Sequence, residues 1–249
     1  MNASICMATF NGARYLRPQL DSILAQMQDG DELIVVDDAS QDDTAQIVRS
    51  YGDARIQLHV NQDNLGHVAS FSRALRLARH PCLVLADQDD VWAEGRLAKL
   101  RDALAAPDVW LATGNAKFID AAGAAIAPVY PELDPADSKR HGLNILRIFS
   151  GKAFYYGCNM AFSAELARLA LPIPAYVESH DLWLAMAANL AGANLHVGEV
   201  LLYRRIHDQN VTNSNRPLWK KLKSRVLFLR SLFQLGVRRY VLRPHSGRV

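Results

Sequence analysis

The sequence lacks three features that mark whole classes of protein. Its three cysteines, Cys6, Cys82 and Cys158, are far apart and form no Cys-x-x-Cys spacing, so neither a zinc site nor a disulfide framework is predicted. Every apolar run is far shorter than the roughly 20 residues that a membrane-spanning helix needs. The amino-terminal residues do not resemble a secretory signal. We therefore expect a protein of the reducing cytoplasm.

Acidic residues are absent from the end of the chain. Ten basic residues and no acidic one occur from Gln209 onward, whereas the remaining 208 residues hold 18 basic and 25 acidic residues, a net charge of −7. The body is therefore acidic and the tail basic. An acidic body repels phosphate backbones, so we expect no nucleic-acid partner.

No repeat is found, and no Gly-x-Gly-x-x-Gly follows the first apolar run, which argues against a Rossmann dehydrogenase. Short apolar runs instead alternate with amphipathic stretches. They predict strands at 4–8, 32–36, 55–60, 82–86 and 109–113, and helices at 15–26, 40–50, 67–79 and 94–105. A capping box at 40–43 would open the second helix. This order predicts an α/β fold with a mostly parallel sheet and helices on both faces.

The alternation of strand and helix patterns weakens after about residue 115. Residues 121–143 contain three prolines and little periodicity, which predicts a long surface excursion that could form a flap over a site. A helix is expected at 178–191, strand-like segments at 195–200 and 201–206, and a final helix at 218–235.

Polar residues gather where the predicted strands end, which is where open α/β sheets bind their ligands. The first cluster, 8–12, ends in Asn11-Gly12, and a simple turn explains it equally well. The second is Asp37-Asp38, two carboxylates that are costly to bring near an apolar sheet. Asp38 could accept a hydrogen bond from a nucleotide base, or one of the pair could cap the next helix; the sequence leaves both readings open.

The strongest pattern is Asp87-Gln88-Asp89-Asp90, in which three carboxylates crowd into four positions after an apolar run. Like charges so close repel each other, and a cation relieves that repulsion. Hard oxygen ligands suit Mg²⁺ or Mn²⁺, with phosphates and water completing the shell. The alternative is a solvated acidic turn that caps the next helix, and we favour the metal site over it.

Two later residues complete the set of candidates. Asp181 begins a predicted helix, where a carboxylate is also favourable simply because of the helix dipole. His207 follows Arg205 in a polar segment, and a surface histidine is its plain alternative. Neither residue by itself is specific evidence for a functional site.

Taken together, these clusters resemble the family 2 glycosyltransferases, inverting enzymes of the GT-A fold, and within them the bacterial rhamnosyltransferase-like branch. The match runs from about Ser4 to Asn213. It is carried by residues 8–12, 36–40 with Asp43 and Thr44, 64–66, 87–92, 157–159, 180–183, and 203–207 with Asn210. The order and spacing of these short motifs are specific, whereas each of them alone is weak.

The resemblance implies a role for each matching position. Asp181 would be the catalytic base. The donor would be contacted by residues in and around the strand ends: Ala8, Thr9, Phe10, Asn11, Asp38, Asn64, Gly66, Asp87, Gln88 and Arg205. Phe10 stands where the family usually has tyrosine, so stacking on the base is retained but a hydroxyl contact is lost.

The resemblance also implies a metal site and an acceptor side. Asp89 and His207 would hold the divalent metal, Mg²⁺ or Mn²⁺, beside the diphosphate, with Arg205 as a further contact to the metal or diphosphate. Gly157, His180 and Trp183 would line the acceptor side. For Gly157 a tight turn, and for Trp183 a core position, are equally good readings.

The activity implied is inverting transfer of a sugar from dTDP-rhamnose or a UDP-sugar to a glycan or lipid-linked acceptor in cell-surface polysaccharide synthesis. Residues 1–215 would form the GT-A domain, with a nucleotide-binding half at about 1–115 and an acceptor half at about 116–215. One alternative is a sugar-1-phosphate nucleotidyltransferase, although residues 7–12 do not form its Gly-rich basic loop. The other is a catalytically inactive nucleotide-sugar-binding module.

Residues 216–249 form a basic amphipathic tail. On a helical wheel, one arc is apolar and the opposite arc is mainly basic and polar: Leu218, Trp219, Leu222, Val226, Leu229, Leu232 and Phe233 against Lys220, Lys223, Ser224, Arg230, Ser231 and Gln234. This pattern suits the surface of an anionic membrane at the inner face of the cell. It equally suits packing on the catalytic domain or on a second subunit, as in a homodimer.

Overall fold

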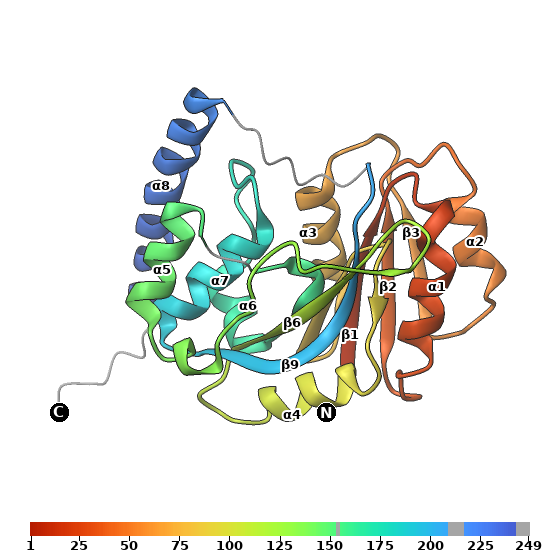
Figure 1. The fold of residues 1–249 in the computed structure, drawn as a ribbon, viewed down its shortest axis with the longest axis horizontal. Helices are drawn as coiled ribbons and strands as arrows, with labels where there is room; N and C mark the ends of the chain where they lie inside the picture. Colours follow the sequence, from red (N-terminus) through yellow and green to blue (C-terminus); the bar gives the residue numbers. More distant parts are fainter. Residues whose placement is uncertain (153–154, 209–216, 243–249) are drawn as a thin grey trace.

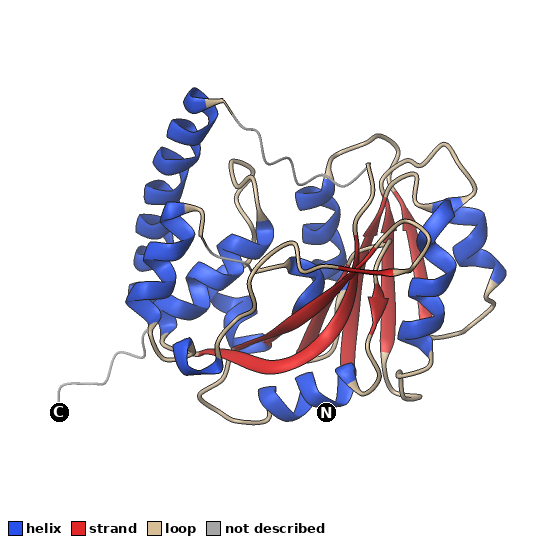
Figure 2. Ribbon diagram, in the orientation of Figure 1, coloured by secondary structure: helices blue, strands red, loops and turns tan. Residues whose placement is uncertain are grey.

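The computed structural model describes residues 1–152, 155–208 and 217–242. Within the last helix it leaves out the side chains of Leu218 and Lys221. Asn210 and Asn213 of the predicted late motif, and the ends of the basic tail, lie outside these residues. A central sheet lies between two layers of helices, and the last helix stands at the far side of the molecule from β3 and α2 (Figures 1 and 2).

One sheet holds all the strands that the described residues form. They are β1 (Ala3–Thr9), β2 (Glu32–Asp37), β3 (Ile56–Val60), β4 (Cys82–Ala86), β5 (Val91–Trp92), β6 (Leu111–Ile119), β7 (Ala125–Ile126), β8 (Met160–Ser163) and β9 (Asn194–Arg205). The order is β3-β2-β1-β4-β8-β6-β9-β5, with β7 paired to β6. The boundary predicted near residue 115 falls within β6, so strands from both predicted halves share this sheet.

The sheet is mixed, whereas the sequence predicted a mostly parallel one. Strands β3, β2, β1 and β4 are parallel to their neighbours, as is the pair β6 and β9. Strand β8, which was not predicted, enters antiparallel between β4 and β6, and the short β5 and β7 also pair antiparallel. The parallel register pairs Thr9 with Asp37 and Met7 with Ala86, so the loops after β1, β2 and β4 meet at one edge.

The helices cover both faces of the sheet, as expected. They are α1 (Ala13–Leu24), α2 (Thr44–Ser50), α3 (His67–Leu77), α4 (Arg96–Leu104), α5 (His141–Ser150), α6 (Ala164–Ala170), α7 (His180–Ala191) and α8 (Leu218–Leu242), with 3₁₀ turns η1 (Pro135–Asp137) and η2 (Gly157–Asn159). One core joins α1, α2 and α4 to the sheet through Ile5 and Val35, and the other joins α3, α6 and α7 through Cys6 and Ile34. Alternate strand residues thus serve opposite cores, which explains why these strands are apolar throughout.

Three local predictions are revised. The expected capping box does not form, because Ser40 donates to Asp37 and α2 begins only at Thr44. The excursion at 121–143 contains β7 and η1, and α5 begins at His141. The two strand-like segments at 195–206 are one strand, β9, whose pairing with β6 shifts register around Asn115.

None of the helices within the described residues combines the length and apolarity needed to cross a membrane. Helix α8 is 25 residues long but carries basic side chains along its length.

We predict that Phe162→Ala destabilises the protein by about 3–5 kcal/mol, because this side chain is fully buried between the sheet and its helices. The matched change Phe233→Ala removes a side chain that is 76% exposed, and we expect less than about 0.5 kcal/mol. Urea unfolding followed by circular dichroism measures both. Equal effects of the two substitutions would contradict the core described here.

Candidate active site

The loops that follow β1 and β2 are joined by reciprocal hydrogen bonds. The Asn11 backbone nitrogen donates to Ser40 Oγ at 2.9 Å, and the Gln41 nitrogen donates to Asn11 Oδ1 at 2.8 Å. Asn11 adopts a left-handed backbone conformation (φ 47°), which asparagine tolerates better than most residues. The Gly12 nitrogen donates to Thr44 Oγ1, which ties the start of α1 to the start of α2.

The loop after β4 is joined to the loop after β1 through Gln88. Its Oε1 accepts from the Phe10 nitrogen at 2.8 Å, and its Nε2 donates to the Phe10 carbonyl at 3.0 Å. A Cβ added at Gly12 would lie 2.2 Å from Gln88 Oε1, so only glycine leaves room for this side chain. The amide that was predicted to contact the donor therefore braces two loops, while the Phe10 ring is 42% exposed beside it.

Asp38 is buried and fastens the loop that contains Asn64. Its carboxylate accepts from the Leu65 nitrogen at 2.9 Å, the Gly66 nitrogen at 2.8 Å and Asn61 Nδ2 at 2.6 Å. Burial by itself would raise the pKa of Asp38, but these hydrogen bonds outweigh it and hold the pKa below its ordinary value. Asp38 is therefore ionised at neutral pH and fixes the backbone at the edge of the predicted base site.

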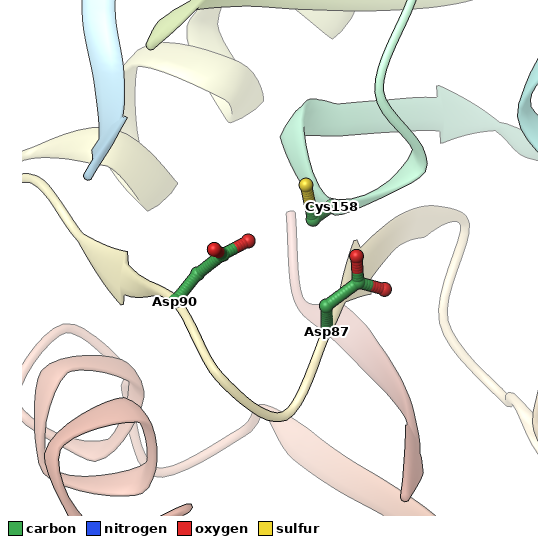
Figure 3. Close-up of side chains that lie close together, drawn as sticks. All are labelled: Asp87, Asp90 and Cys158. Atoms are coloured by element: carbon green, nitrogen blue, oxygen red, sulfur yellow. The ribbon is translucent and has the colours of Figure 1, made fainter. Parts of the chain in front are cut away.

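The three carboxylates of the acidic loop point in different directions. Asp89 Oδ2 lies 2.9 Å from His207 Nε2, so the two predicted metal residues are in direct contact. Asp87 and Asp90 instead converge with Cys158, and one ligand atom from each lies within 4.8 Å of the others (Figure 3). Burial raises the pKa of the Cys158 thiol, which leaves it protonated and a poor ligand for a hard cation.

The convergence of Asp87 and Asp90 is electrostatically unfavourable without a cation. Burial first, and then the charges of Asp90, Asp89 and Asp181, raise the pKa of Asp87 to about 8. Burial and the charge of Asp89 raise the pKa of Asp90 to about 6. Asp90 Oδ2 is buried and accepts no hydrogen bond from the described residues. These oxygens fit Mg²⁺ or Mn²⁺, which would be bound through the two carboxylates beside Asp89 and His207.

Arg205 is 5% exposed, and it holds the acidic loop in place. Its Nε donates to the Asp89 carbonyl at 2.9 Å, its Nη1 donates to the Asp120 carbonyl at 3.1 Å, and its backbone nitrogen donates to Asp90 Oδ1. Its guanidinium also lies 5.0 Å from the centre of the Tyr15 ring. These contacts give Arg205 a positioning role toward the acidic loop, in addition to the phosphate contact that the sequence predicted.

Sequence reasoning did not select Arg204, although it lies near the same carboxylates. Burial would lower its pKa, but the charges of neighbours that include Asp90 and Asp87 raise it above its ordinary value. The guanidinium packs 4.1 Å from the centre of the Tyr156 ring. The sequence did contain a signal for Arg204. Side chains alternate along a strand, so Arg204 and Arg205 of β9 point to opposite faces and each could be considered separately as a site residue.

Asp181 lies in the first turn of α7, where Ser179 Oγ and the Leu182 nitrogen both donate to its Oδ1. A Cβ added at Gly157 would lie 3.5 Å from the Asp181 Cβ, so η2 packs directly against this residue. The next residue of η2, Cys158, contacts the acidic loop on the other side. The structure therefore brings Asp181 and the acidic loop together around one turn.

Two predicted acceptor-side residues are buried. Trp183 is 1% exposed, and its Nε1 donates to the Ala170 carbonyl within the core. The prediction that Trp183 lines the acceptor side is therefore wrong, because the ring offers no surface to a ligand. His180 packs against Phe71 with ring centroids 4.3 Å apart, behind Gly157. Burial, against the opposing charge of Asp181, lowers the pKa of His180 to about 4, so this side chain is neutral.

A cavity of about 340 Å³ lies beside β6, β7 and β9. Its lining residues are Val91, Lys117, Phe118, Ile119, Gly123, Ala125, Tyr203 and Arg205. Arg205 is shared with the acidic loop, but none of the carboxylates of that loop lines this cavity. It is therefore a neighbouring feature and not the centre of the site.

We predict that the pH dependence of stability reports on Asp87. Its pKa is raised from the ordinary value of 3.8 to about 8 in the folded chain, so the stability it contributes is fully present below about pH 4 and is lost as the pH rises from there to about 8. In EDTA, the melting temperature should fall across this range. Asp87→Asn cannot ionise and should flatten the fall, whereas Asp108→Asn, at an exposed loop position, should not. An unchanged pH profile in Asp87→Asn would contradict the buried charge cluster.

Comparison with proteins of known sequence identifies the family of this chain. The sequence model of the family "Glycosyl transferase family 2" matches residues 4–169. An uncharacterized glycosyltransferase of Rickettsia felis is 25% identical over 235 residues, which cover 87% of this chain and 37% of that protein. The Escherichia coli UDP-Glc:alpha-D-GlcNAc-diphosphoundecaprenol beta-1,3-glucosyltransferase WfgD is 28% identical over 117 residues, 47% of this chain and 46% of that protein. The matched segments thus cover less than half the length of each of these two relatives.

Solved structures share the fold at low sequence identity. The Staphylococcus aureus protein TarS (residues 1–349), in complex with UDP-GlcNAc, gives a TM-score of 0.69 at 17% identity over 99% of this chain and 75% of that one. The mannosyltransferase PcManGT from Pyrobaculum calidifontis, in complex with GDP-Man and Mn²⁺, gives a TM-score of 0.62 at 20% sequence identity. The match covers 99% of this chain and 76% of that one. The fold is therefore that of the GT-A glycosyltransferases, and with two thirds of its length matched by the family's sequence model, this chain belongs to glycosyl transferase family 2.

Proposed function

We propose that this protein transfers a sugar from a nucleotide-diphosphate donor to a hydroxyl group of a saccharide acceptor. The observation that carries the proposal is the position of Asp181, which packs against η2 and whose charge acts on Asp87 of the acidic loop. A proton acceptor beside a cation-binding carboxylate cluster is the arrangement that this transfer needs.

The first half of the chain would bind the donor. The exposed ring of Phe10 would flank the base, and the backbone at Asn64 and Gly66, fixed by Asp38, would border it. Ala8, Thr9 and Asn11 at the end of β1 would line the same edge. A divalent metal, Mg²⁺ or Mn²⁺, held by Asp87, Asp89 and Asp90 with His207, would neutralise the charge that develops on the departing diphosphate.

The second half would supply the acceptor side and the base. Both hydrogen bonds that Asp181 accepts from the described residues are made at Oδ1, so we propose that Oδ2 takes the proton from the attacking hydroxyl. The hydroxyl oxygen would attack the anomeric carbon from the face opposite the nucleotide, and the configuration at that carbon would invert. Gly157 lets η2 pack directly against His180 at the start of α7, because a side chain there would collide with His180, and we propose that this packing sets the position of Asp181.

The relatives support a class of donor and acceptor without fixing either one. WfgD is named for UDP-Glc and a diphosphoundecaprenol-linked sugar, and the TarS structure contains UDP-GlcNAc. We propose a UDP-sugar or dTDP-rhamnose as donor, and a glycan or lipid-linked saccharide as acceptor, in cell-surface polysaccharide synthesis. A lipid-linked acceptor would place the protein at the inner face of the cell membrane, in peripheral contact through residues 216–249. Self-association through the same residues is the alternative.

The test is the release of sugar from a panel of UDP- and dTDP-sugars in Mn²⁺, with wild-type protein and Asp181→Asn. We expect at least one donor to be turned over, and Asp181→Asn to lower the rate by about 10²–10⁴-fold while nucleotide affinity, measured by calorimetry, is retained. Asp181→Asn protein with full turnover would remove this residue from the mechanism. Tight donor binding by wild-type protein without any turnover would indicate an inactive binding module instead.

A second substitution tests the geometry around η2. A Cβ at position 157 would lie 2.6 Å from His180 Nε2, so Gly157→Ala should displace the start of α7 and with it Asp181. We expect kcat to fall by about 100-fold, since small displacements of a catalytic group have effects of this size, while KM for the donor changes little. The control is Gly142→Ala, where an added Cβ meets no atom within 4 Å. Equal rates for both variants would contradict the proposed contact.

A further inference from the structure

Helix α8 exposes a continuous apolar stripe. Its large apolar residues recur every three or four positions, which aligns them along one side of the helix. They are Trp219, Leu222, Val226, Leu229, Phe233, Val237 and Tyr240, and their exposed fractions run from 46% to 76%. We call these seven residues the α8 stripe. Such a long row of exposed large apolar side chains indicates an interaction surface.

The opposite side of α8 packs on the rest of the chain. Leu235 is fully buried in the core and Ser231 is 6% exposed, while Phe228 stacks edge-on against Phe149 of α5. Arg238 donates to the Ala170 carbonyl at 2.8 Å. The helix is therefore docked through the side that the helical wheel had taken as largely polar, and the described residues leave the α8 stripe uncovered. Of the predicted apolar arc, Leu232 packs against the core. Trp219, Leu222, Val226, Leu229 and Phe233 are exposed and are not covered by the described part of the chain.

The charge of α8 decides whether the α8 stripe binds a membrane surface or a second copy of the chain. Residues 218–242 contain seven basic residues and no acidic one. Lys223, whose side chain is 60% exposed, and Arg230 follow one edge of the α8 stripe, and Arg225 follows the other. Pairing with the same stripe of a second copy would bring these like charges together. An anionic lipid surface complements them, and its acyl region accepts the tryptophan, leucine and phenylalanine side chains.

We propose that the α8 stripe is a membrane-docking surface that inserts at the interface of a bilayer containing anionic lipids. The helix lies flat on the bilayer and does not cross it. The basic residues along the edges of the α8 stripe, Lys223, Arg225 and Arg230, contact the headgroups, and the apolar residues of the stripe enter the acyl boundary. The protein is thereby held at the membrane by a surface separate from the carboxylates of the candidate active site.

Docking through α8 also orients the protein. Ser224 Oγ donates to Glu178 Oε2 at 3.0 Å, and Lys223 Nζ lies 3.4 Å from Glu178 Oε1. Tyr176 donates to Gln234 at 2.6 Å in the same loop. This loop leads directly into Asp181, so docking through the α8 stripe would fix the orientation of the segment that carries the proposed base relative to the bilayer. This orientation, unlike the docking itself, rests on the proposed function, since it matters only if the acceptor is lipid-linked.

Co-sedimentation of the full chain with vesicles tests the proposal. We expect binding to phosphatidylcholine vesicles that contain phosphatidylglycerol, weaker binding at high salt, and little binding to pure phosphatidylcholine. The triple change Leu222→Ser, Leu229→Ser and Phe233→Ser should reduce binding at least about tenfold. These side chains are exposed, so the variant should keep the wild-type melting temperature. The control, Val60→Ser, alters an exposed apolar residue of β3 at the other side of the molecule (Figure 1) and should bind as wild type.

Light scattering after size-exclusion chromatography measures the oligomeric state and tests the alternative, self-association through the α8 stripe. A dimer that the triple variant converts to a monomer would overturn the proposal and assign the α8 stripe to a second copy. Absence of binding to anionic vesicles would overturn it as well. Binding is measured without donor or acceptor, and Asp181→Asn should bind vesicles as wild type does. Failure of docking is therefore distinguishable from failure of the proposed sugar transfer.

Discussion

The site depends on the confinement of three carboxylates in one short loop. Asp87 and Asp90 are drawn toward the buried Cys158, and Asp89 is turned toward His207, so the loop concentrates negative charge where water is scarce. The repulsion raises the pKa values of Asp87 and Asp90, and a divalent cation is the partner that would relieve it. Contacts from several elements of the chain hold this unfavourable arrangement in place.

Four contacts supply that restraint from different parts of the chain. Gln88 clasps the backbone of Phe10, Gln19 donates to the Asp87 carbonyl, and Arg205 binds the Asp89 carbonyl. Beneath them the fully buried Arg96 donates to the Cys158 carbonyl at 2.7 Å, and its guanidinium lies 4.4 Å from the centre of the Trp92 ring. Because a charged loop is costly to assemble without its cation, such bracing preorganises it for binding.

The sequence predicted those parts of the fold whose signal is local. Strands β1, β2 and β4 each contain an unbroken apolar run, at 5–8, 33–36 and 82–86, and the predicted position of β4 matches the structure at both ends. Strand β8 is only four residues long and is stabilised by its two neighbours, so no local pattern announced it. Because β8 was not predicted, the mixed parallel and antiparallel character of the sheet was not predicted either. The burial of Trp183 was equally hidden, because a tryptophan in a first helical turn suits a core and a binding surface alike.

The candidate site was predictable in its residue types but not in its contacts. Asp38, Asp87 and Asp181 follow from strand ends and a helix start, whereas the Gln88 clasp joins residues 78 positions apart. The assignment of Arg204 and Arg205 to opposite faces of β9 depends on a register that a shift of one residue would reverse. Likewise, the helical wheel of α8 showed two arcs, but only tertiary packing determined which of them is exposed.

The central claim is that the acidic loop binds a nucleotide diphosphate through a divalent cation next to Asp181. Calorimetric titration of UDP and dTDP into the protein, in Mn²⁺ and in EDTA, tests it most directly. We expect Mn²⁺ to strengthen binding of at least one of these nucleotides by more than about tenfold, and Asp89→Asn to abolish this gain. Equal affinity with and without the metal, or a full metal effect in Asp89→Asn, would contradict it.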